Sequence, residues 1–285
     1  MLAGDLANAF AGKRFDMHVH TTASDGVSAP ADVVRQAAAL GLGGLAITDH
    51  DTCDGLVEAA AAARQTGITL IFGVELSCEL APARGEAVHE VHMLGYFYDP
   101  ARRELGQMLR YLQQQRRLRA VRILQALADA GMPLDSTFLR DYAEAGAPGR
   151  GLIARKMVQA GYVQDSDEAF DKWLGHGRPA YVPRWRLDAT EAVRLLHRAG
   201  GVAVMAHPIQ ARDDRLIALL AAAGLDGLEC CHPDHDAGQE QHYRAIAQRL
   251  GLATTGGSDH HESGLGGHTA AGAEIMELLR RRHSK

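Results

Sequence analysis

The chain has 285 residues, 46% of them hydrophobic, which fits one α/β barrel or two ordinary globular domains. Its 30 basic and 35 acidic residues give a formal net charge of −5, which argues against a broad electrostatic grip on long nucleic acid. No apolar run approaches the roughly 18 residues of a membrane span, and no basic patch precedes an apolar core at the N-terminus. We therefore expect no membrane segment and no signal peptide, and a cytoplasmic location.

Cysteine and histidine usage points away from disulfides and towards metal chemistry. The four cysteines, Cys53, Cys78, Cys230 and Cys231, have no Cys-x-x-Cys spacing, so a structural zinc site and a disulfide framework are poor interpretations. Small apolar side chains in a reducing cytoplasm explain them better. The 15 histidines are many for a chain of this length and suggest bound metal.

The first hundred residues alternate between strand and helix patterns. A short apolar run at residues 15–17 precedes a helix pattern at residues 29–40, in which Pro30 fits an early helical position. A strand pattern then leads to Thr48, a helix covers about residues 56–65, and the next strand leads to Glu75. This rhythm predicts βα units and a mostly parallel sheet.

The rhythm breaks after residue 99. A long helix is expected at about residues 102–130, followed by shorter helical segments, and no strand pattern occurs until about residue 181. The shorter segments are residues 136–145, 151–160 and 166–174. We interpret residues 100–183 as a helical insertion between two strands of a barrel formed by residues 1–99 and 184–285. The arginines of the long helix are interpreted as a solvated face: Arg110, Arg116, Arg117, Arg119 and Arg122.

The βα rhythm then resumes. Helix patterns cover residues 189–199, 214–223 and 239–250, a strand pattern covers residues 227–231, and a last helix covers about residues 271–282.

Metal-ligand side chains recur where apolar runs stop. His18 and His20 are two residues apart, so on a strand their rings point to the same face. Further candidates are Asp25, His50, Glu75, His92, His207, Asp259 and His261. In a parallel barrel the carboxyl ends of the strands meet at the end that carries the chemistry. Imidazole and carboxylate ligands together suit zinc, manganese or iron.

Five motifs in order resemble those of the PHP (polymerase and histidinol phosphatase) family. They are the His-x-His-Thr-x-x-Ser-Asp-Gly stretch at residues 18–26, Thr-Asp-His-Asp at 48–51, Gly-Val-Glu at 73–75, Ala-His-Pro at 206–208 and Gly-Ser-Asp-x-His at 257–261. More closely, the chain resembles bacterial single-domain members that act as 3′,5′-nucleoside bisphosphate phosphatases, some of which also trim RNA from the 5′ end. The resemblance implies a distorted (β/α)7-type barrel with a helical insertion that covers the active site.

The resemblance also implies how the ligands are grouped. A first ion would be held by His18, His20, Asp259 and a bridging Glu75, and a second by Glu75, His92 and His207. A third would be held by Asp25, His50 and His261. The resemblance favours Mn²⁺, with two or three ions per chain, and Fe²⁺ or Zn²⁺ are alternatives. His89 competes with His92 for its role, and Asp49, Asp51 and His260 are candidates for orienting the ligands.

Candidate substrate groups lie after a later strand and in and beside the helical insertion. His232 and His235 follow a strand, and one of them would contact phosphate or act as the general acid. Arg178 and Arg184 lie where the insertion rejoins the barrel and would grip a phosphate. Arg150 and Arg155 are weaker candidates.

Phosphoester hydrolysis needs no protein nucleophile when clustered metals activate water and neutralise phosphoryl oxygens. A Gly-x-Ser-x-Gly elbow and a P-loop are both absent from the sequence. The expected function is hydrolysis of the 3′-phosphate of 3′,5′-nucleoside bisphosphates, such as adenosine 3′,5′-bisphosphate. Alternatives are a 5′-to-3′ exonuclease on short RNA or DNA, a histidinol-phosphate phosphatase, and a non-catalytic metal-dependent binding module. The expected partner is a small phosphorylated nucleotide, with short RNA as a further candidate and no membrane; the oligomeric state is left open.

Overall fold

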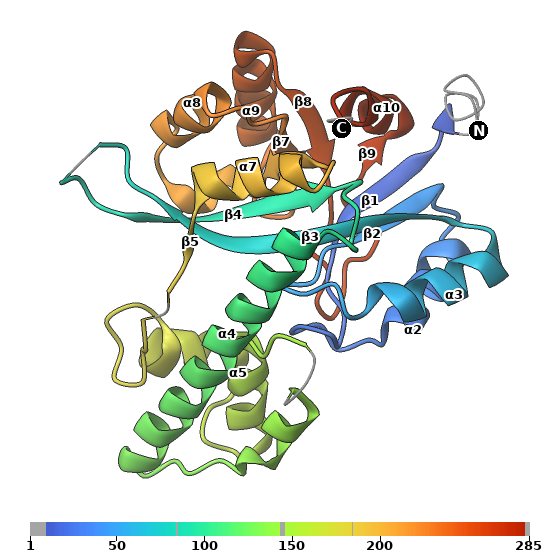
Figure 1. The fold of residues 1–285 in the computed structure, drawn as a ribbon. Helices are drawn as coiled ribbons and strands as arrows, with labels where there is room; N and C mark the ends of the chain where they lie inside the picture. The colour runs from blue at the N-terminus through green and yellow to red at the C-terminus, as the bar shows by residue number, and fades with distance from the viewer. Residues whose placement is uncertain (1–9, 84, 143–145, 184, 283–285) are drawn as a thin grey trace.

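One twisted sheet, wound into a nearly closed barrel, organises the fold. The structure is a computed structural model that describes residues 10–83, 85–142, 146–183 and 185–282. Helices cover the outside of the sheet, and a separate group of helices lies to one side of it (Figure 1). The strands are β1 (Arg14–Val19), β2 (Gly44–Ile47), β3 (Thr69–Leu80), β4 (His89–Tyr96), β5 (Leu187–Asp188), β6 (Val202–Met205), β7 (Gly227–Cys231), β8 (Ala253–Gly256) and β9 (Ala270–Ala271).

The strand order explains how the sheet approaches closure. The order is β8-β7-β6-β4-β3-β2-β1-β9, with β5 paired to β3. Strands β1 to β3 are parallel to one another, and so are β6 to β8, whereas β4 is antiparallel to both neighbours. A parallel bridge between Val19 and His260 joins the first strand to the segment after the last parallel strand. The distorted α/β barrel expected from the sequence is therefore confirmed.

The helices follow the sequence patterns closely. They are α2 (Pro30–Ala39), α3 (Leu56–Thr66), α4 (Arg103–Asp129), α5 (Arg150–Gln159), α6 (Ser166–Ala169), α7 (Ala189–Arg198), α8 (Arg215–Ala222), α9 (Ala237–Leu250) and α10 (Gly272–Arg280), with the 3₁₀ segments η1 (Ser136–Tyr142) and η3 (Pro208–Ala211) and the π-helical segment η2 (Phe170–Leu174). Helix α9 shows why the boundaries are sharp. Asp236 and Gln239 form a capping box at its start, and Gly251 ends it at a φ of 68°.

A β-bulge in β1 aims the first histidines at the barrel interior. The register with β2 shifts between Asp16 and Val19. Phe15 and Met17 pack in one hydrophobic cluster, and Val19 packs in the other, where the helices cover the sheet. In a regular strand, neighbouring residues lie on opposite faces, so His18 would lie on the outer face when Met17 lies on the inner one. The bulge breaks this alternation and places His18 on the inner face together with Met17.

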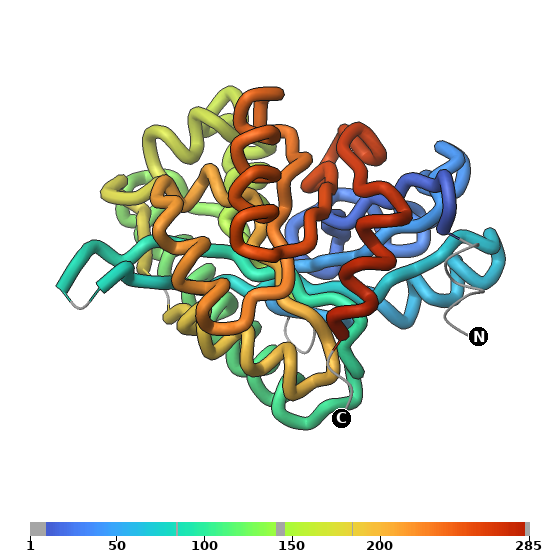
Figure 2. Tube along the Cα trace, turned by 90° about the horizontal axis from the view of Figure 1, so that it is seen from above, coloured from blue at the N-terminus to red at the C-terminus, as the bar shows by residue number. Residues whose placement is uncertain are grey.

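The long helix α4 leads away from the barrel into the group of helices, as Figure 1 shows. Figure 1 shows these helices at one end of the sheet, and Figure 2 views the molecule from above, the side opposite these helices. They contact the loops that follow β1 and β2, since the backbone N–H of Ala147 donates to the carbonyl of Ala23 at 3.0 Å and Arg116 pairs with Asp51 at 2.6 Å. They have their own hydrophobic cluster, which includes Ile123, Leu127, Ile153 and Met157. The division into a barrel and an insertion at residues 100–183 stays a prediction, although the helices lie where it expects them. None of the helices in the described part of the chain has both the length and the apolar character needed to cross a bilayer.

One expectation about the sheet needs correction, and another is confirmed. Strand β3 runs on to Leu80, so Glu75 lies inside a strand and not at its end. The expectation of a mostly parallel sheet is confirmed, since five of the eight pairings among the described strands are parallel, although β4 runs antiparallel to β3 and β6. This direction brings His92, opposite Ser77 in the ladder, to the same end of the barrel as the carboxyl ends of the parallel strands.

Candidate active site

Glu75 lies at the centre of the candidate site. The side chain is 1% exposed, and its Oε2 atom lies 2.8 Å from Nδ1 of His50. The same oxygen lies 3.3 Å from Nε2 of His20 and 3.5 Å from Nε2 of His18. A backbone bridge between His50 and Glu75 fixes this approach, because it ties the loop after β2 to the middle of β3. One carboxylate oxygen thus faces three imidazoles.

The other oxygen of Glu75 faces two more histidines. Its Oε1 atom lies 2.8 Å from Nδ1 of His92 on β4 and 3.1 Å from Nε2 of His207, which follows β6. His207 has a φ of 23°, a sparsely populated conformation for a non-glycine residue. Asp51 and Asp259, at the same end of the barrel, also have positive φ, at 55° and 48°. Strained backbone of this kind collects at functional sites, where the surrounding structure holds it in place.

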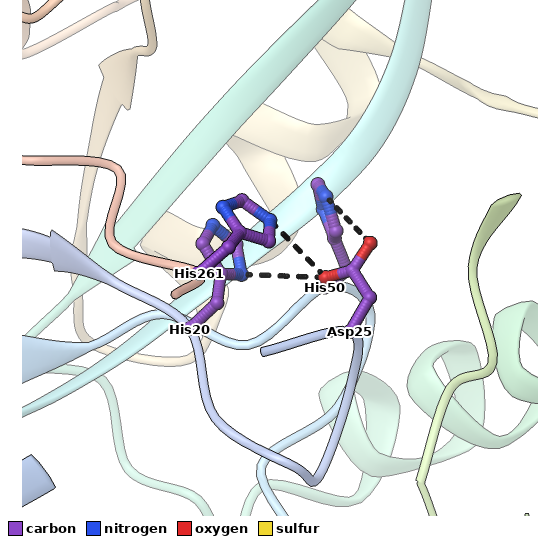
Figure 3. Close-up of side chains that lie close together, drawn as sticks. All are labelled: His20, Asp25, His50 and His261. Atoms are coloured by element: carbon purple, nitrogen blue, oxygen red, sulfur yellow. Dashed lines mark ion pairs between the residues drawn. The ribbon is translucent and has the colours of Figure 1, made fainter. Parts of the chain in front are cut away.

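Two further groups complete the cluster. Oδ1 of Asp259 lies 3.1 Å from Nε2 of His20 and 3.4 Å from Nε2 of His18. Asp25 faces His20 and His50 at 4.0 Å each and His261 at 3.3 Å. Figure 3 shows these three rings turned towards the Asp25 carboxylate from separate segments of the chain. Every predicted metal ligand is therefore brought to one end of the barrel, and the ligand roles stay predictions.

The donor atoms of the cluster fit divalent cations. Buried nitrogen and oxygen atoms are normally hydrogen-bonded, yet many here have no hydrogen-bond partner of acceptable geometry in the described structure. They are Nε2 of His18, both ring nitrogens of His20, Oδ1 of Asp25, Nδ1 of His50, Oε2 of Glu75, Nε2 of His92 and Oδ1 of Asp259. Imidazole nitrogens and carboxylate oxygens converging in groups of three or four match the ligand chemistry of a transition metal.

The electrostatics keep the carboxylates charged. Burial would raise the pKa of Glu75, but the surrounding histidines, His50 and His92 foremost, hold that pKa well below its usual range. Burial favours a neutral His20, yet Asp259 and Glu75 raise the pKa of His20 to about 10. Burial lowers the pKa of His50 to about 4. A metal ion would replace the positive charge that protons supply on these imidazoles, so its binding would release protons.

Glu229, on β7, is a buried residue that the sequence analysis did not single out. Its carboxylate lies 3.1 and 3.2 Å from Nδ1 of His18 and accepts the backbone N–H of His207 at 2.9 Å. With Nδ1 engaged in this way, Nε2 of His18 is left to face Glu75 and Asp259. The signal in the sequence was a lone carboxylate inside the apolar run Gly-Leu-Glu-Cys-Cys.

The residues expected to orient ligands have well-defined partners. Asp49 accepts hydrogen bonds from the backbone and hydroxyl of Thr21, at 2.7 Å each, and from the hydroxyl of Ser24 at 2.6 Å. These bonds shape the loop that carries His20 and Asp25. His260 instead directs Nδ1 to the carbonyl of Ser263, at 3.0 Å.

The two predicted catalytic histidines lie beside the cluster. Nδ1 of His232 accepts the backbone N–H of Asp234 at 3.1 Å, so a neutral His232 carries its proton on Nε2, 3.5 Å from Oδ2 of Asp259. His235 donates from Nδ1 to the carbonyl of Cys230 at 2.8 Å, which leaves its Nε2 unprotonated when the ring is neutral. The geometry therefore distinguishes the two residues, and His232 is the one with a proton facing the cluster.

A cavity of about 390 Å³ adjoins the cluster and is lined by arginines. Asp25, His50, His92 and His261 form its metal-facing wall, and Arg116, Arg119, Arg150 and Arg155 form much of the rest. The expectation of a solvated face on α4 is wrong for two of its arginines. Arg116 and Arg119 are 5% and 7% exposed and line this cavity. Their spacing of three residues puts them on one side of the helix, but Arg122 follows at the same spacing and is exposed, so the sequence did not single them out.

The other predicted arginines are placed differently. Arg150, at the start of α5, lines the cavity, and its guanidinium lies over the ring of Phe170 with the centroid at 5.4 Å. Arg178 is exposed and is not among the described residues that line the cavity. Arg184 lies outside the described residues. Arg155, a weaker candidate like Arg150, lines the cavity and donates from Nη2 to the backbone carbonyl of Asp25 at 2.6 Å.

Comparisons with known proteins agree with this geometry. A family model described as PHP domain matches residues 16–136. The chain is 36% identical over 257 residues to a Haemophilus influenzae protein named 5′-3′ exoribonuclease, covering 87% of this chain and 90% of that one. It is 35% identical over 268 residues to a Chromobacterium violaceum protein named 3′,5′-nucleoside bisphosphate phosphatase, covering 92% of each. A Bifidobacterium adolescentis structure described as a candidate metal-dependent phosphoesterase superposes with a TM-score of 0.84 at 33% identity, covering 94% of this chain and 96% of that one.

These similarities extend over nearly the whole chain, and the barrel places its histidines and carboxylates as a metal-dependent hydrolase requires. Both the similarities and the arrangement of these side chains indicate an enzyme, and not the non-catalytic binding module considered from the sequence. The chain belongs to the PHP-domain family and is a metal-dependent phosphoesterase.

Proposed function

We propose that the enzyme removes the 3′-phosphate from 3′,5′-nucleoside bisphosphates, for example converting adenosine 3′,5′-bisphosphate to AMP and phosphate. The observation that supports this most is the arginine-lined cavity beside the cluster. A substrate with two phosphates can place one on the cluster and the other among the arginines, whose planar guanidinium groups bind phosphate through paired hydrogen bonds.

The proposed cofactor is Mn²⁺, two or three ions per chain, with Fe²⁺ or Zn²⁺ as alternatives. The donor set has imidazoles and carboxylates and no thiolate, which suits these metals. The proposed ligands are His18, His20, Asp25, His50, Glu75, His92, His207, Asp259 and His261. When bound, divalent cations here would lower the pKa of an attacking water and neutralise charge on the phosphoryl oxygens.

The chain's own residues would position the substrate and move a proton. Arg150 and Arg119 would hold the phosphate that does not react, and this remote binding energy would position the one that does. His232 would donate its Nε2 proton to the departing 3′ oxygen, because its Nδ1 is already an acceptor. In this proposal residues 100–183 cap the barrel, since α4 and α5 carry the arginines of the cavity. A cytoplasmic location stays a prediction.

A second candidate is a 5′-to-3′ exoribonuclease, which the name of the Haemophilus relative favours. The same cavity would then hold the 5′-phosphate of a short RNA, and the cluster would hold the first internucleotide phosphate. Histidinol phosphate has a single phosphate and would bring no second phosphate to the arginines, so it fits this cavity less well.

Phosphate release tests the proposal. With Mn²⁺ present, we expect kcat/KM for adenosine 3′,5′-bisphosphate to exceed the values for 5′-AMP and 3′-AMP by about tenfold to hundredfold, the worth of one charge-assisted phosphate contact. Chromatography should identify 5′-AMP as the product. Similar efficiency on the monophosphates would refute the two-phosphate model, and faster turnover of a 5′-phosphorylated oligoribonucleotide would favour the exoribonuclease.

A matched pair of variants tests the arginines. Arg150→Ala should lower kcat/KM for the bisphosphate by about tenfold or more, while its effect on an aryl phosphate stays small. Arg122→Ala, an exposed arginine of α4 that does not line the cavity, serves as the control. Equal losses on both substrates in Arg150→Ala would remove this residue from the proposed phosphate site.

A further inference from the structure

Two hollows adjoin the arginine-lined cavity and share lining residues with it. One, of about 500 Å³, shares Arg155, Ser166 and Glu262 with it. The other, of about 190 Å³, shares Glu90, His92 and Arg150. A nucleotide seated between the cluster and the arginines therefore has these two hollows through which a longer chain could continue. Each passage has a carboxylate, Glu262 or Glu90, where the cavities meet.

The larger hollow is the better route for a continuing chain. The smaller one has less than half its volume. The carboxylate of Glu90 also accepts a hydrogen bond from Nη2 of Arg186 at 2.6 Å, so its charge is largely balanced. Substrate length is therefore best controlled where the cavity meets the larger hollow, at Glu262.

Glu262 stands at that boundary with most of its side chain in solvent. It directly follows His261, its side chain is 58% exposed, and Oε1 lies 3.7 Å from Nη1 of Arg155. The other amine of that guanidinium is engaged, because Nη2 donates to the backbone carbonyl of Asp25. At 3.7 Å the interaction is an exposed ion pair and not a tight hydrogen bond, so the negative charge of Glu262 still faces the passage.

The surface beyond Glu262 is acidic as well. Asp165 and Asp167 line the hollow, and Arg155 is the one cationic side chain among the described residues that line it. Lys156 is not among the described residues that line the hollow, and its ammonium contacts the amide oxygen of Gln159 at 3.1 Å and lies 5.7 Å from the centroid of the Phe138 ring. A nucleic-acid backbone, which adds one negative charge per nucleotide, would meet like charge along this path.

We propose that Glu262 is a specificity-determining residue that limits the length of the substrate. Its carboxylate repels the phosphates of an oligonucleotide that continue past the cavity, whereas a bisphosphorylated mononucleotide ends before it. This inference rests on the proposed function and deepens it. It explains the preference for a mononucleotide by the carboxylate of Glu262, which belongs neither to the candidate metal ligands nor to the four arginines of the cavity.

The test compares kcat/KM across adenosine 3′,5′-bisphosphate, a 5′-phosphorylated dinucleotide and a 5′-phosphorylated pentanucleotide. In the unmodified enzyme, efficiency should fall as length increases. Glu262→Gln keeps the size of the side chain and should lower the ratio of bisphosphate to pentanucleotide efficiency by about two- to fivefold, the range typical of one exposed charge interaction. Glu262→Lys should lower this ratio further.

Glu277→Gln is the matched control, since Glu277 is also an exposed carboxylate paired with arginines but lies on α10. In this variant, the ratio of kcat/KM for the bisphosphate to kcat/KM for the pentanucleotide should equal that of the unmodified enzyme. An unchanged ratio in both Glu262 variants would overturn the length control and leave the proposed function standing. An unmodified enzyme that prefers the pentanucleotide to the bisphosphate would overturn both.

Discussion

Arg116 is a buried link between α4 and the barrel, and its removal should destabilise the protein strongly. Nε of Arg116 lies 2.6 Å from Oδ2 of Asp51, and the two side chains are 5% and 2% exposed. Nη2 also donates to the hydroxyl of Ser77 on β3 at 2.7 Å. The same Asp51 accepts the backbone N–H of Ser77 through Oδ1 at 2.8 Å. Arg116→Ala would remove the guanidinium from a carboxylate that stays buried.

The expected cost follows from this burial. Removing one partner of a buried ion pair costs about 3–5 kcal/mol, because the remaining charge keeps its desolvation penalty without its partner. For a chain of this size, 1 kcal/mol corresponds to about 2–4 °C, so Tm should fall by roughly 6–20 °C. Asp51→Asn should also destabilise, and asparagine tolerates the φ of 55° at this position.

Equilibrium denaturation of chelator-treated protein measures these effects without a contribution from bound metal. In a double-mutant cycle, Arg116→Ala combined with Asp51→Asn should cost clearly less than the sum of the two single changes. Arg110→Ala, an exposed arginine on the same helix, should stay within about 0.5 kcal/mol of the unmodified protein. Strict additivity, or a loss of less than 1 kcal/mol for Arg116→Ala, would refute the reasoning.

Two further changes probe the support of His18. A Cβ at Gly257 would lie 2.3 Å from Cβ of His18, so Gly257→Ala should displace the ring of His18. The metal content of this variant, measured by elemental analysis, should fall. Full metal content would show that the structure accommodates the added methyl group. Glu229→Gln removes the charged acceptor at Nδ1 of His18 and should weaken metal affinity by about tenfold to hundredfold, measured by competition with a chelating dye. Unchanged affinity would leave Glu229 a purely structural residue.

Much of the fold could be predicted because local patterns and tertiary contacts agree. Helix α2 begins at Pro30, and helix α3 ends at Gly67, which has a φ of 75°. Proline favours the first position of a helix and glycine favours the left-handed residue that ends one, so both boundaries could be predicted from the residue types. The direction of β4 could not be predicted, since an apolar strand pattern is the same in both directions. The antiparallel pairing of β3 and β4 depends on the hairpin that joins them.

The candidate site could likewise be predicted only in part from the sequence. The candidate ligands could be found because histidine and carboxylate are conspicuous after apolar runs. The arginines could not, because Arg116 and Arg119 belong to a helix with many charged residues, and only the packing of α4 on the barrel separates these two from exposed Arg110 and Arg122. A charge pattern along one helix carries no information about which face another element will cover.

Metal stoichiometry tests most directly whether the cluster around Glu75 is a multinuclear metal centre. The protein is stripped with a chelator, reconstituted with Mn²⁺, passed through a desalting column and analysed by mass spectrometry of the elements. The unmodified chain should retain more than one ion, whereas Glu75→Gln should lose metal and phosphatase activity together, since one carboxylate faces both groups of histidines. One ion or none in the unmodified chain, or full metal content and activity in Glu75→Gln, would contradict the account.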